Sequence, residues 1–222
     1  MTDKLKVGII GSGRLGTALT RLLLGAGYEV RIANSRGPES LELLLSVLLP
    51  GAIATTIDEA VSRSDVIILA LPAGSYRTLD EGLFAGKIVV DAMNYWAPTE
   101  GVITEFADPA ISTSSVVQQY LSGAKVVKTL NHVAYNELEE HSLPAGDSSR
   151  RAVFVASDDS EAKRRVCVIV DAIGFDSVDM GMLSDGVKFQ PDTPLFNTRL
   201  GIDDVKSTVS IGSSDKPQAS LL

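Results

Sequence analysis

Apolar positions at the start of the chain alternate between short continuous runs and stripes with helical spacing. Val7 to Ile10 is an apolar run that ends at a glycine, which is typical of a strand buried on both faces. From Leu15 to Ala26 the apolar residues recur every three or four positions, and Gly27 follows as a stop signal. Tyr28 to Ala33 returns to strand chemistry. The opening therefore predicts a strand, a helix and a second strand.

The same alternation continues through the first half of the chain. The predicted elements are a helix from Pro38 to the break at Pro50, a strand at 52–55, a helix at 56–63, a strand at 66–71, a helix at 75–84 and a strand at 87–91. Thr56 and Glu59 form a capping-box pattern that marks one of the helix starts. Strands and helices that alternate in this way predict parallel strands joined by right-handed crossovers.

The second half of the chain is less regular. Residues 94–111 contain two prolines and a glycine and predict a long loop, which in a compact domain is often functional. A helix at 112–121, strands at 126–130 and 151–156, a helix at 158–173 and a strand at 175–180 are expected to follow. We therefore expect an α/β fold with a doubly wound, mostly parallel sheet of the Rossmann type and a strand-helix-strand C-terminal extension. Residues 1–200 would form a single domain, and residues 201–222 a polar tail or an arm that reaches a partner subunit.

A glycine-rich turn joins the first predicted strand to the first predicted helix. Its sequence, Gly11-Ser12-Gly13-Arg14-Leu15-Gly16, fits the G-x-G-x-x-G pattern in the structural context that the pattern requires. Gly11 would permit the tight turn, Gly13 would let the backbone approach a pyrophosphate, and Gly16 would let the helix pack on the strand. The helix N-terminus adds free N–H groups and a partial positive charge. We expect a dinucleotide here; the alternative is a simple glycine-rich turn.

The end of the second predicted strand lies where the adenosine ribose of a dinucleotide would rest. Folds that prefer NAD place an acidic residue there, whereas this chain has Asn34, Ser35 and Arg36. A hydroxyl and a guanidinium would bind a 2′-phosphate through charge-assisted hydrogen bonds. The sequence thus favours NADP(H) over NAD(H), although a solvated arginine that caps the next helix, or use of both cofactors, is an alternative.

The nicotinamide end of the cofactor should lie at the carboxyl ends of the later strands. The candidates are Leu71, Pro72 and Ala73 after the fourth strand, Met93 and Asn94 after the fifth, and Asn131, Val133 and Ala134 after the sixth. Each of these segments is also compatible with an ordinary loop.

Composition limits the classes of function. The formal charge of −8 argues against a nucleic-acid surface, and no apolar run is long enough to predict membrane insertion. One cysteine and two histidines, without metal-ligand spacing, argue against a metal site. The N-terminus does not have the pattern of a signal peptide, so a cytoplasmic protein is expected.

No residue stands out as a firm catalytic acid or base. His132 follows a predicted strand and is a candidate proton donor, but a structural hydrogen-bonding role is the alternative. The Tyr-x-x-x-Lys pair of short-chain dehydrogenases is absent from the sequence.

Several segments together suggest a family. They are VGIIGSGRLGTALTRLLLGAGYEVRIANSRG, DVIILALP, KIVVDAMN, KVVKTLNHV and DDSEAKRRVCVIVDAIGFDSVDMG, and they span much of residues 5–200. The chain resembles the coenzyme F-420-dependent NADP oxidoreductases, relatives of which include the cytoplasmic NADPH domains of membrane ferric reductases. The resemblance implies a homodimer that binds NADP(H) and passes hydride to or from a deazaflavin or flavin.

The resemblance also implies roles for individual residues. Ser12 to Leu15 would hold the pyrophosphate, Ser35 and Arg36 the 2′-phosphate, and Leu71, Asn94 and Asn131 to Ala134 the nicotinamide end. Tyr95-Trp96 and the segment from Phe189 to Phe196 are candidate walls for a second ring, or alternatively aromatic loops packed on the core.

Three functions are compatible with the sequence. The first is an NADP(H)-dependent oxidoreductase with a small-molecule redox acceptor, a deazaflavin or flavin. The second is an NADPH reductase of a small carbonyl or imine, with His132 or Tyr95 as proton donor. The third is a non-catalytic module that senses NADP(H).

Overall fold

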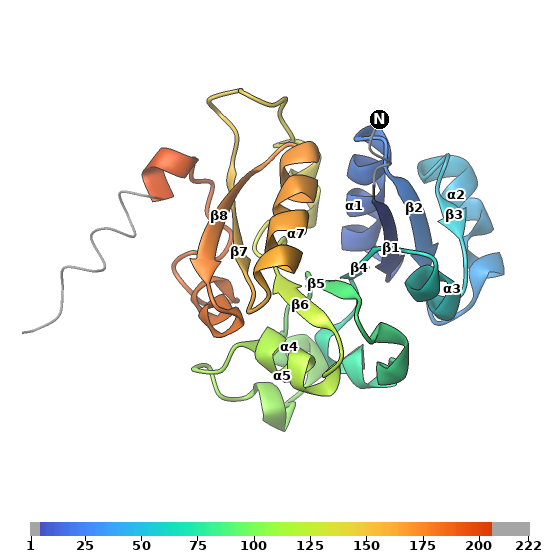
Figure 1. Cartoon of the computed structure of the whole chain (residues 1–222), viewed down its shortest axis with the longest axis horizontal. Helices are drawn as coiled ribbons and strands as arrows, with labels where there is room; N and C mark the ends of the chain where they lie inside the picture. Colours follow the sequence, from blue (N-terminus) through green and yellow to red (C-terminus); the bar gives the residue numbers. More distant parts are fainter. Residues whose placement is uncertain (1–4, 206–222) are drawn as a thin grey trace, which may run out of the picture.

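Eight strands form one sheet in the order β3-β2-β1-β4-β5-β6-β7-β8 (Figure 1). The computed structural model describes residues 5–205. The strands are β1 (Lys6–Ile10), β2 (Glu29–Ala33), β3 (Ile53–Ala54), β4 (Val66–Leu69), β5 (Ile88–Asp91), β6 (Lys125–Lys128), β7 (Ala152–Ala156) and β8 (Asp176–Gly181). The chain reverses its direction across the sheet between β1 and β4, which creates the crevice where doubly wound sheets bind ligands.

Short helices and 3₁₀ turns connect these strands. The α-helices are α1 (Arg14–Gly25), α2 (Glu42–Leu48), α3 (Ile57–Ser62), α4 (Ala97–Glu100), α5 (Thr113–Tyr120), α6 (Tyr135–Leu138) and α7 (Ser160–Ala172). The 3₁₀ turns are η1 (Pro38–Leu41), η2 (Ala73–Thr78), η3 (Glu81–Phe84), η4 (Thr104–Phe106) and η5 (Leu183–Phe189). In the range 5–205, no helix is long and apolar enough to cross a membrane.

The strands inside the sheet are buried on both faces, because helices cover both sides of the sheet, whereas the edge strands β3 and β8 are partly exposed. One apolar cluster contains alternate strand residues such as Ile68 together with residues of α1 and α7. The other contains the intervening residues, such as Ile67, together with side chains from α3, η2 and α5. Strands covered in this way lack polar alternation, which explains the continuous apolar runs of the sequence.

The sheet is parallel except at one junction. β6 and β7 pair antiparallel through Lys128 and Ala156, and β7 then pairs with β8 in parallel through the crossover helix α7. The predicted doubly wound, mostly parallel sheet of the Rossmann type with a strand-helix-strand extension is therefore confirmed.

Four segments differ from the predicted elements. Residues 75–84 form the turns η2 and η3 rather than one helix, since Leu79 is extended and the Asp80 carboxylate accepts a hydrogen bond from the Gly82 N–H at 3.0 Å. The predicted loop at 94–111 contains α4 and η4. The sequence pattern also did not indicate α6 or η5, which have four and seven residues.

Part of the predicted C-terminal tail belongs to the folded body. Val205 is buried and packs in a third apolar cluster with Phe154 and Phe189. The rest of the predicted tail, residues 206–222, lies outside the described residues. How the chain divides into domains stays a prediction.

Candidate functional site

The three glycines of the turn between β1 and α1 have different surroundings. Gly11 has φ +118°, and a Cβ there would lie 2.1 Å from the Ala70 carbonyl oxygen. A Cβ on Gly16 would lie 1.9 Å from the Gly11 carbonyl oxygen, so this glycine allows α1 to pack on the turn. Around Gly13, by contrast, no atom lies within 4 Å of the Cβ position. The missing side chain of Gly13 therefore leaves open space at the N-terminus of α1.

Asn34 ties the end of β2 to the glycine turn. Its side-chain Nδ2 donates to Ser12 Oγ at 3.1 Å and to Ser40 Oγ at 3.0 Å. Its Oδ1 accepts a hydrogen bond from the Arg36 backbone N–H at 2.9 Å. Asn34 thus fixes the backbone that carries the exposed side chains of Ser35 and Arg36.

Two cavities meet at the glycine turn. The ribose-side cavity, about 380 Å³, is lined by Gly11, Ser12, Gly13, Asn34, Ser35 and residues that follow β4. The nicotinamide-side cavity, about 530 Å³, lies on the other side of the turn. Both are lined by Gly13 and by Ala70, Leu71 and Pro72. Together they form a continuous groove over the carboxyl ends of the central strands.

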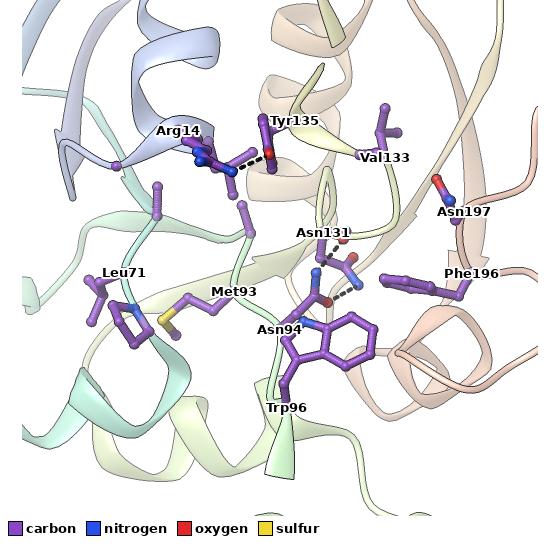
Figure 2. A pocket seen from close by; sticks show the side chains of 16 residues that line it. Arg14, Leu71, Met93, Asn94, Trp96, Asn131, Val133, Tyr135, Phe196 and Asn197 are labelled. Atoms are coloured by element: carbon purple, nitrogen blue, oxygen red, sulfur yellow. Dashed lines mark hydrogen bonds between the residues drawn. The ribbon is translucent and has the colours of Figure 1, made fainter. Parts of the chain in front are cut away.

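Figure 2 shows the nicotinamide-side cavity between α1, the ends of the central strands and the C-terminal segment. Its further lining residues are Arg14, Leu15, Ala92, Met93, Asn94, Trp96, Asn131, Val133, Ala134, Tyr135, Phe196 and Asn197. The groove therefore brings together residues from three strand ends that the sequence analysis identified separately.

Two asparagines form a reciprocal pair at the floor of this cavity (Figure 2). Asn94 Nδ2 donates to the Asn131 backbone oxygen at 2.6 Å, and Asn131 Nδ2 donates to Asn94 Oδ1 at 3.2 Å. Asn131 Nδ2 also donates to the Phe189 carbonyl oxygen at 3.0 Å. Leu130, directly before Asn131, has φ +64°, a strained backbone that turns the chain at the end of β6. The pair presents amide groups of fixed orientation to the cavity.

A buried polar network supports Met93 from below. The Asp91 carboxylate accepts hydrogen bonds from the Met93 N–H at 3.0 Å and from Ser114 Oγ at 2.6 Å. Lys128 Nζ donates to Ser114 Oγ at 3.1 Å. Burial lowers the pKa of the Lys128 ammonium, and the Asp91 carboxylate opposes that effect. The network holds the strand ends of β5 and β6 rigidly beneath the cavity.

His132 points away from the cavity and into the core. Its Nε2 accepts a hydrogen bond from the Phe154 N–H at 3.0 Å, and Nδ1 lies 3.4 Å from Asn131 Oδ1. The ring is stacked on Phe154 with centroids 4.8 Å apart and contacts the edge of Phe189. Burial lowers its pKa to about 3. The structure thus favours the structural role of His132 over that of a proton donor, because a buried neutral ring outside the cavity lining cannot deliver a proton there.

Arg14 and Tyr135 face each other across the mouth of the cavity (Figure 2). Arg14 Nη1 donates to the Tyr135 hydroxyl at 2.6 Å, and the guanidinium lies 5.4 Å from the ring centroid. They are the titratable side chains among the residues that line this cavity. The sequence analysis missed Tyr135, because it lies on the short helix α6.

An aromatic pair lines one end of the cavity. The rings of Trp96 and Phe196 meet edge to face, with centroids 5.7 Å apart. Asn197, next to Phe196, has φ +57°, and its N–H donates to the His132 carbonyl oxygen at 3.0 Å. This bond anchors a segment far along the chain to the end of β6, a contact that no local sequence pattern indicates.

Most, but not all, of the predicted cofactor residues line the groove. Gly16 packs α1 on the turn, Ala73 is buried in the second core cluster, and Arg36 lies beyond the ribose-side cavity. Among residues 5–205, no group of three or more His, Cys, Asp or Glu side chains is placed to hold a metal ion.

Comparisons with known proteins agree with this geometry. Rat metalloreductase STEAP3 is 34% identical over 81% of this chain, and human metalloreductase STEAP2 is 28% identical over 82%. The chain spans about a third of the length of these relatives, 34% of each.

Solved structures share the fold. A hypothetical protein from Sinorhizobium meliloti is 28% identical, with a TM-score of 0.75 over 89% of this chain and 96% of the other. A proposed F420-dependent NADP reductase from Arthrobacter sp. FB24 is 24% identical, with a TM-score of 0.70 over 82% of this chain and 86% of the other. At 24% identity the latter likeness supports the fold alone.

The glycine turn and the first five strands also match a family model. Residues 6–95 match the model described as NADP oxidoreductase coenzyme F420-dependent. This match confirms the resemblance noted in the sequence and agrees with an NADP-linked oxidoreductase. Over residues 6–95, this chain is therefore similar to the family of coenzyme F420-dependent NADP oxidoreductases.

Proposed function

We propose that this protein is an NADP(H)-dependent oxidoreductase that passes hydride between NADPH and a flavin or deazaflavin. The observation that carries the proposal is the pair of cavities that meet at Gly13 and Leu71-Pro72. One adjoins Ser12, Asn34 and Ser35, and the other extends between an amide pair and an aromatic pair. A dinucleotide that crosses the glycine turn would place one half in each cavity.

The residues at the turn fit a pyrophosphate. The open space at Gly13 lets phosphate oxygens approach the free N–H groups at the start of α1. This helix has 12 residues, and its aligned peptide dipoles place a partial positive charge at its N-terminus. Arg36 is exposed beyond Ser35, where its guanidinium would form a charge-assisted bond with a 2′-phosphate. We infer from this that NADP(H) is preferred over NAD(H).

The chemistry of hydride transfer needs alignment more than acid or base. When bound, the cofactor would supply a hydride from nicotinamide C4 to the acceptor ring, and solvent would supply the one proton that completes the two-electron reduction. Asn94 and Asn131 would orient the carboxamide, while Leu71, Met93 and Val133 provide apolar walls against the rings. The cavity therefore positions two rings without requiring His132.

The names of the mammalian relatives support a reductase whose final acceptor is a metal ion. STEAP3 and STEAP2 are named metalloreductases, and this chain corresponds to about a third of each. Under the proposal, the chain would perform the NADPH-dependent half of such a reaction, and a flavin reduced by it would be the diffusible product.

The direct test is the oxidation of NADPH in the presence of an acceptor. The protein is mixed with NADPH and, in parallel, with an oxidised deazaflavin, FMN or riboflavin, and bleaching of the acceptor is followed. Turnover with any one supports the proposal. Tight NADPH binding without turnover of these acceptors or of a carbonyl panel would contradict it and favour an NADP(H) sensor.

Tyr135 favours a second candidate function. Its hydroxyl faces the nicotinamide-side cavity and receives a hydrogen bond from Arg14, so it would be a proton donor to a carbonyl or imine. His132 is buried, and the Tyr95 hydroxyl is held between the Gly101 oxygen and the Ile103 N–H. If this candidate is right, Tyr135→Phe loses carbonyl or imine turnover by roughly 100-fold and still binds NADPH.

A further inference from the structure

A third cavity lies on the other side of Trp96 from the nicotinamide-side cavity, and Trp96 lines both. We call it the outer cavity; its volume is about 350 Å³. Aromatic rings and prolines form one part of its wall: Tyr95, Trp96, Pro98, Phe106, Pro109 and Pro191. Polar side chains form the other part: Asp108, Thr113, Gln190, Asp192 and Thr193. It is therefore half apolar and half polar, at the end of the groove farthest from the ribose-side cavity.

The polar wall is held in place by its own hydrogen bonds. Gln190 Oε1 accepts from the Thr113 N–H at 2.6 Å and from Thr113 Oγ1 at 3.0 Å. Asp108 Oδ1 accepts from the Ala110 N–H at 2.9 Å, and Asp192 has φ +65°. A residue such as Asp tolerates this left-handed conformation better than most. The Asp108 carboxylate is thus held by a backbone hydrogen bond, and Asp192 lies at a left-handed backbone position in the cavity wall.

The charge of this wall is of one sign. Asp108 and Asp192 are its charged side chains, and no Lys, Arg or His lines the outer cavity. Neither carboxylate forms an ion pair within residues 5–205. The nearby cations Arg77 and Lys188 are paired instead with Glu105 and Asp185. Behind this wall, Lys128 Nζ donates to Thr113 Oγ1 at 3.3 Å. An occupant of the outer cavity therefore meets hydrogen-bond acceptors and two exposed carboxylates, with one buried cation behind them.

We propose that the outer cavity binds the side chain of the acceptor, and that it selects a flavin with an uncharged polyhydroxyl chain over a phosphorylated one. The inference rests on the proposed function, in which the acceptor ring lies against the nicotinamide. From that position, a substituent on the acceptor ring would pass along Trp96 into the outer cavity. Riboflavin, which carries a ribityl chain without phosphate, has the matching chemistry.

Hydrogen bonding and electrostatics act in the same direction. Ribityl hydroxyls donate to carboxylates, and such charge-assisted bonds are stronger than neutral ones. The phosphate of FMN carries close to two negative charges at neutral pH, and the two carboxylates repel it. The opposite end of the groove has the opposite character, since Arg36 lies there. Each end thus selects one ligand: a phosphate beside Arg36 and a neutral chain beside Asp108 and Asp192.

The experiment compares riboflavin with FMN, which share one ring system and differ by one phosphate. We expect kcat/KM for riboflavin to exceed that for FMN by about fivefold at low ionic strength, as like charges in a solvated site imply. The difference in kcat/KM between the two flavins should narrow in 0.5 M salt, because at that ionic strength salt screens the repulsion between the FMN phosphate and the carboxylates over roughly a few Å. A measurement of binding alone, by the anisotropy of flavin emission with NADP⁺-saturated protein, should show the same order of affinities.

Three substitutions locate the effect. Asp108→Asn and Asp192→Asn each remove a charge and keep the side-chain shape, and each should lower the ratio of riboflavin to FMN in both measurements. Asp147→Asn is the matched control: Asp147 also accepts a hydrogen bond from the N–H two residues on, at 2.8 Å, but lies in the loop after α6. That variant should keep the wild-type ratio.

The outcomes separate this inference from the proposed function. If both flavins are reduced equally well, or FMN is preferred, hydride transfer to a flavin stands and the selection by the outer cavity is wrong. The selection is also wrong if neither aspartate substitution moves the ratio, or if Asp147→Asn moves it as much. If neither flavin nor the deazaflavin oxidises NADPH while riboflavin still binds more tightly than FMN, the proposed function fails and the binding site stands.

Discussion

At the residue scale, glycines of one motif perform different physical tasks. A side chain on Gly16 would overlap the protein's own backbone, whereas a side chain on Gly13 would enter open space at the start of α1. Gly16 is therefore needed for folding, and Gly13 leaves room for the ligand.

This difference predicts opposite phenotypes for two alanine substitutions. Gly16→Ala should lower the free energy of unfolding by about 1–3 kcal/mol, because overpacking displaces the turn. Gly13→Ala should leave the urea midpoint almost unchanged and weaken NADPH binding roughly tenfold, through a misfit of similar energy at the phosphate. Calorimetric titration and urea unfolding of both variants check this. A destabilised Gly13→Ala protein with normal NADPH affinity would contradict it.

Arg36 carries the predicted preference for the 2′-phosphate. We expect NADP(H) to bind at least roughly tenfold more tightly than NAD(H), since a hydrogen bond between charged groups contributes 1.5–3 kcal/mol. Arg36→Ala should remove most of that difference, and Arg36→Lys should restore part of it because the charge is kept but the planar fork is lost. Titration with both cofactors measures it; equal affinities in the unmodified protein would disprove the preference.

Individual site residues were predictable where a local motif carries them. Ser12 and Asn34 were found because a glycine turn and a strand end have fixed positions in this fold. Phe196 was named only as part of a candidate aromatic wall, and Asn197 was not named, since only a long-range bond from Asn197 to His132 brings that residue to the groove.

At the scale of elements, apolar runs located nearly every strand, because the strands inside the sheet are buried on both faces. The predicted helix at 75–84 failed, since apolar spacing does not reveal that Leu79 is extended and that Asp80 starts a new turn. The antiparallel contact of β6 with β7 also has no signal in the strand sequences themselves.

The end of β6 gives the fold a sensitivity to acid. In the folded protein burial lowers the pKa of His132 to about 3, against an ordinary value of 6.5. As pH falls below the ordinary value, the unfolded chain binds a proton that the folded protein does not, so stability is lost by about 1.4 kcal/mol per pH unit.

Replacement of His132 by glutamine should remove this dependence. Between pH 7 and pH 5 the unmodified protein should lose about 2 kcal/mol of unfolding free energy through this group, because its charge is excluded from the core. His132→Gln, which keeps an acceptor for the Phe154 N–H, should show a shallower slope in urea titrations over that range, even if it is less stable throughout. Parallel slopes would show that another group is responsible.

At the scale of the molecule, the groove joins two parts of the sheet. Its lining comes from β1 and β2 on one side and from β5, β6 and the C-terminal segment on the other. Sequence order placed these strand ends at one edge of a parallel sheet, which is why most of the groove was predictable. Two walls of the outer cavity, Tyr95-Trp96 and residues 190–193, were named as candidates for a second ring site. Their packing against residues 106–113 was not predictable from the sequence pattern.

A ligand that spans both parts should stabilise the whole chain. At a concentration 100 times its dissociation constant, NADPH should add about 2.7 kcal/mol to the free energy of unfolding. NADH at the same concentration should add less, because it lacks the 2′-phosphate. Thermal unfolding with each cofactor measures this difference, and identical shifts would count against a cofactor in this groove.

The homodimer and the cytoplasmic location implied by the sequence stay proposals. Exposed apolar side chains on α2 and the adjacent edge strand β3, namely Leu43, Val47, Leu48 and Ile53, are compatible with a subunit contact. Light scattering should give twice the chain mass if the dimer forms, and the single chain mass if it does not.

Trp96 is the one tryptophan of the chain, and it lines both the nicotinamide-side cavity and the outer cavity. Its indole emits in the wavelength range that reduced nicotinamide absorbs, and oxidised nicotinamide does not absorb there. The protein thus contains its own optical reporter, whose brightness would follow the redox state of the bound cofactor without any added label. A stopped-flow trace of that emission would time binding and hydride transfer within one turnover.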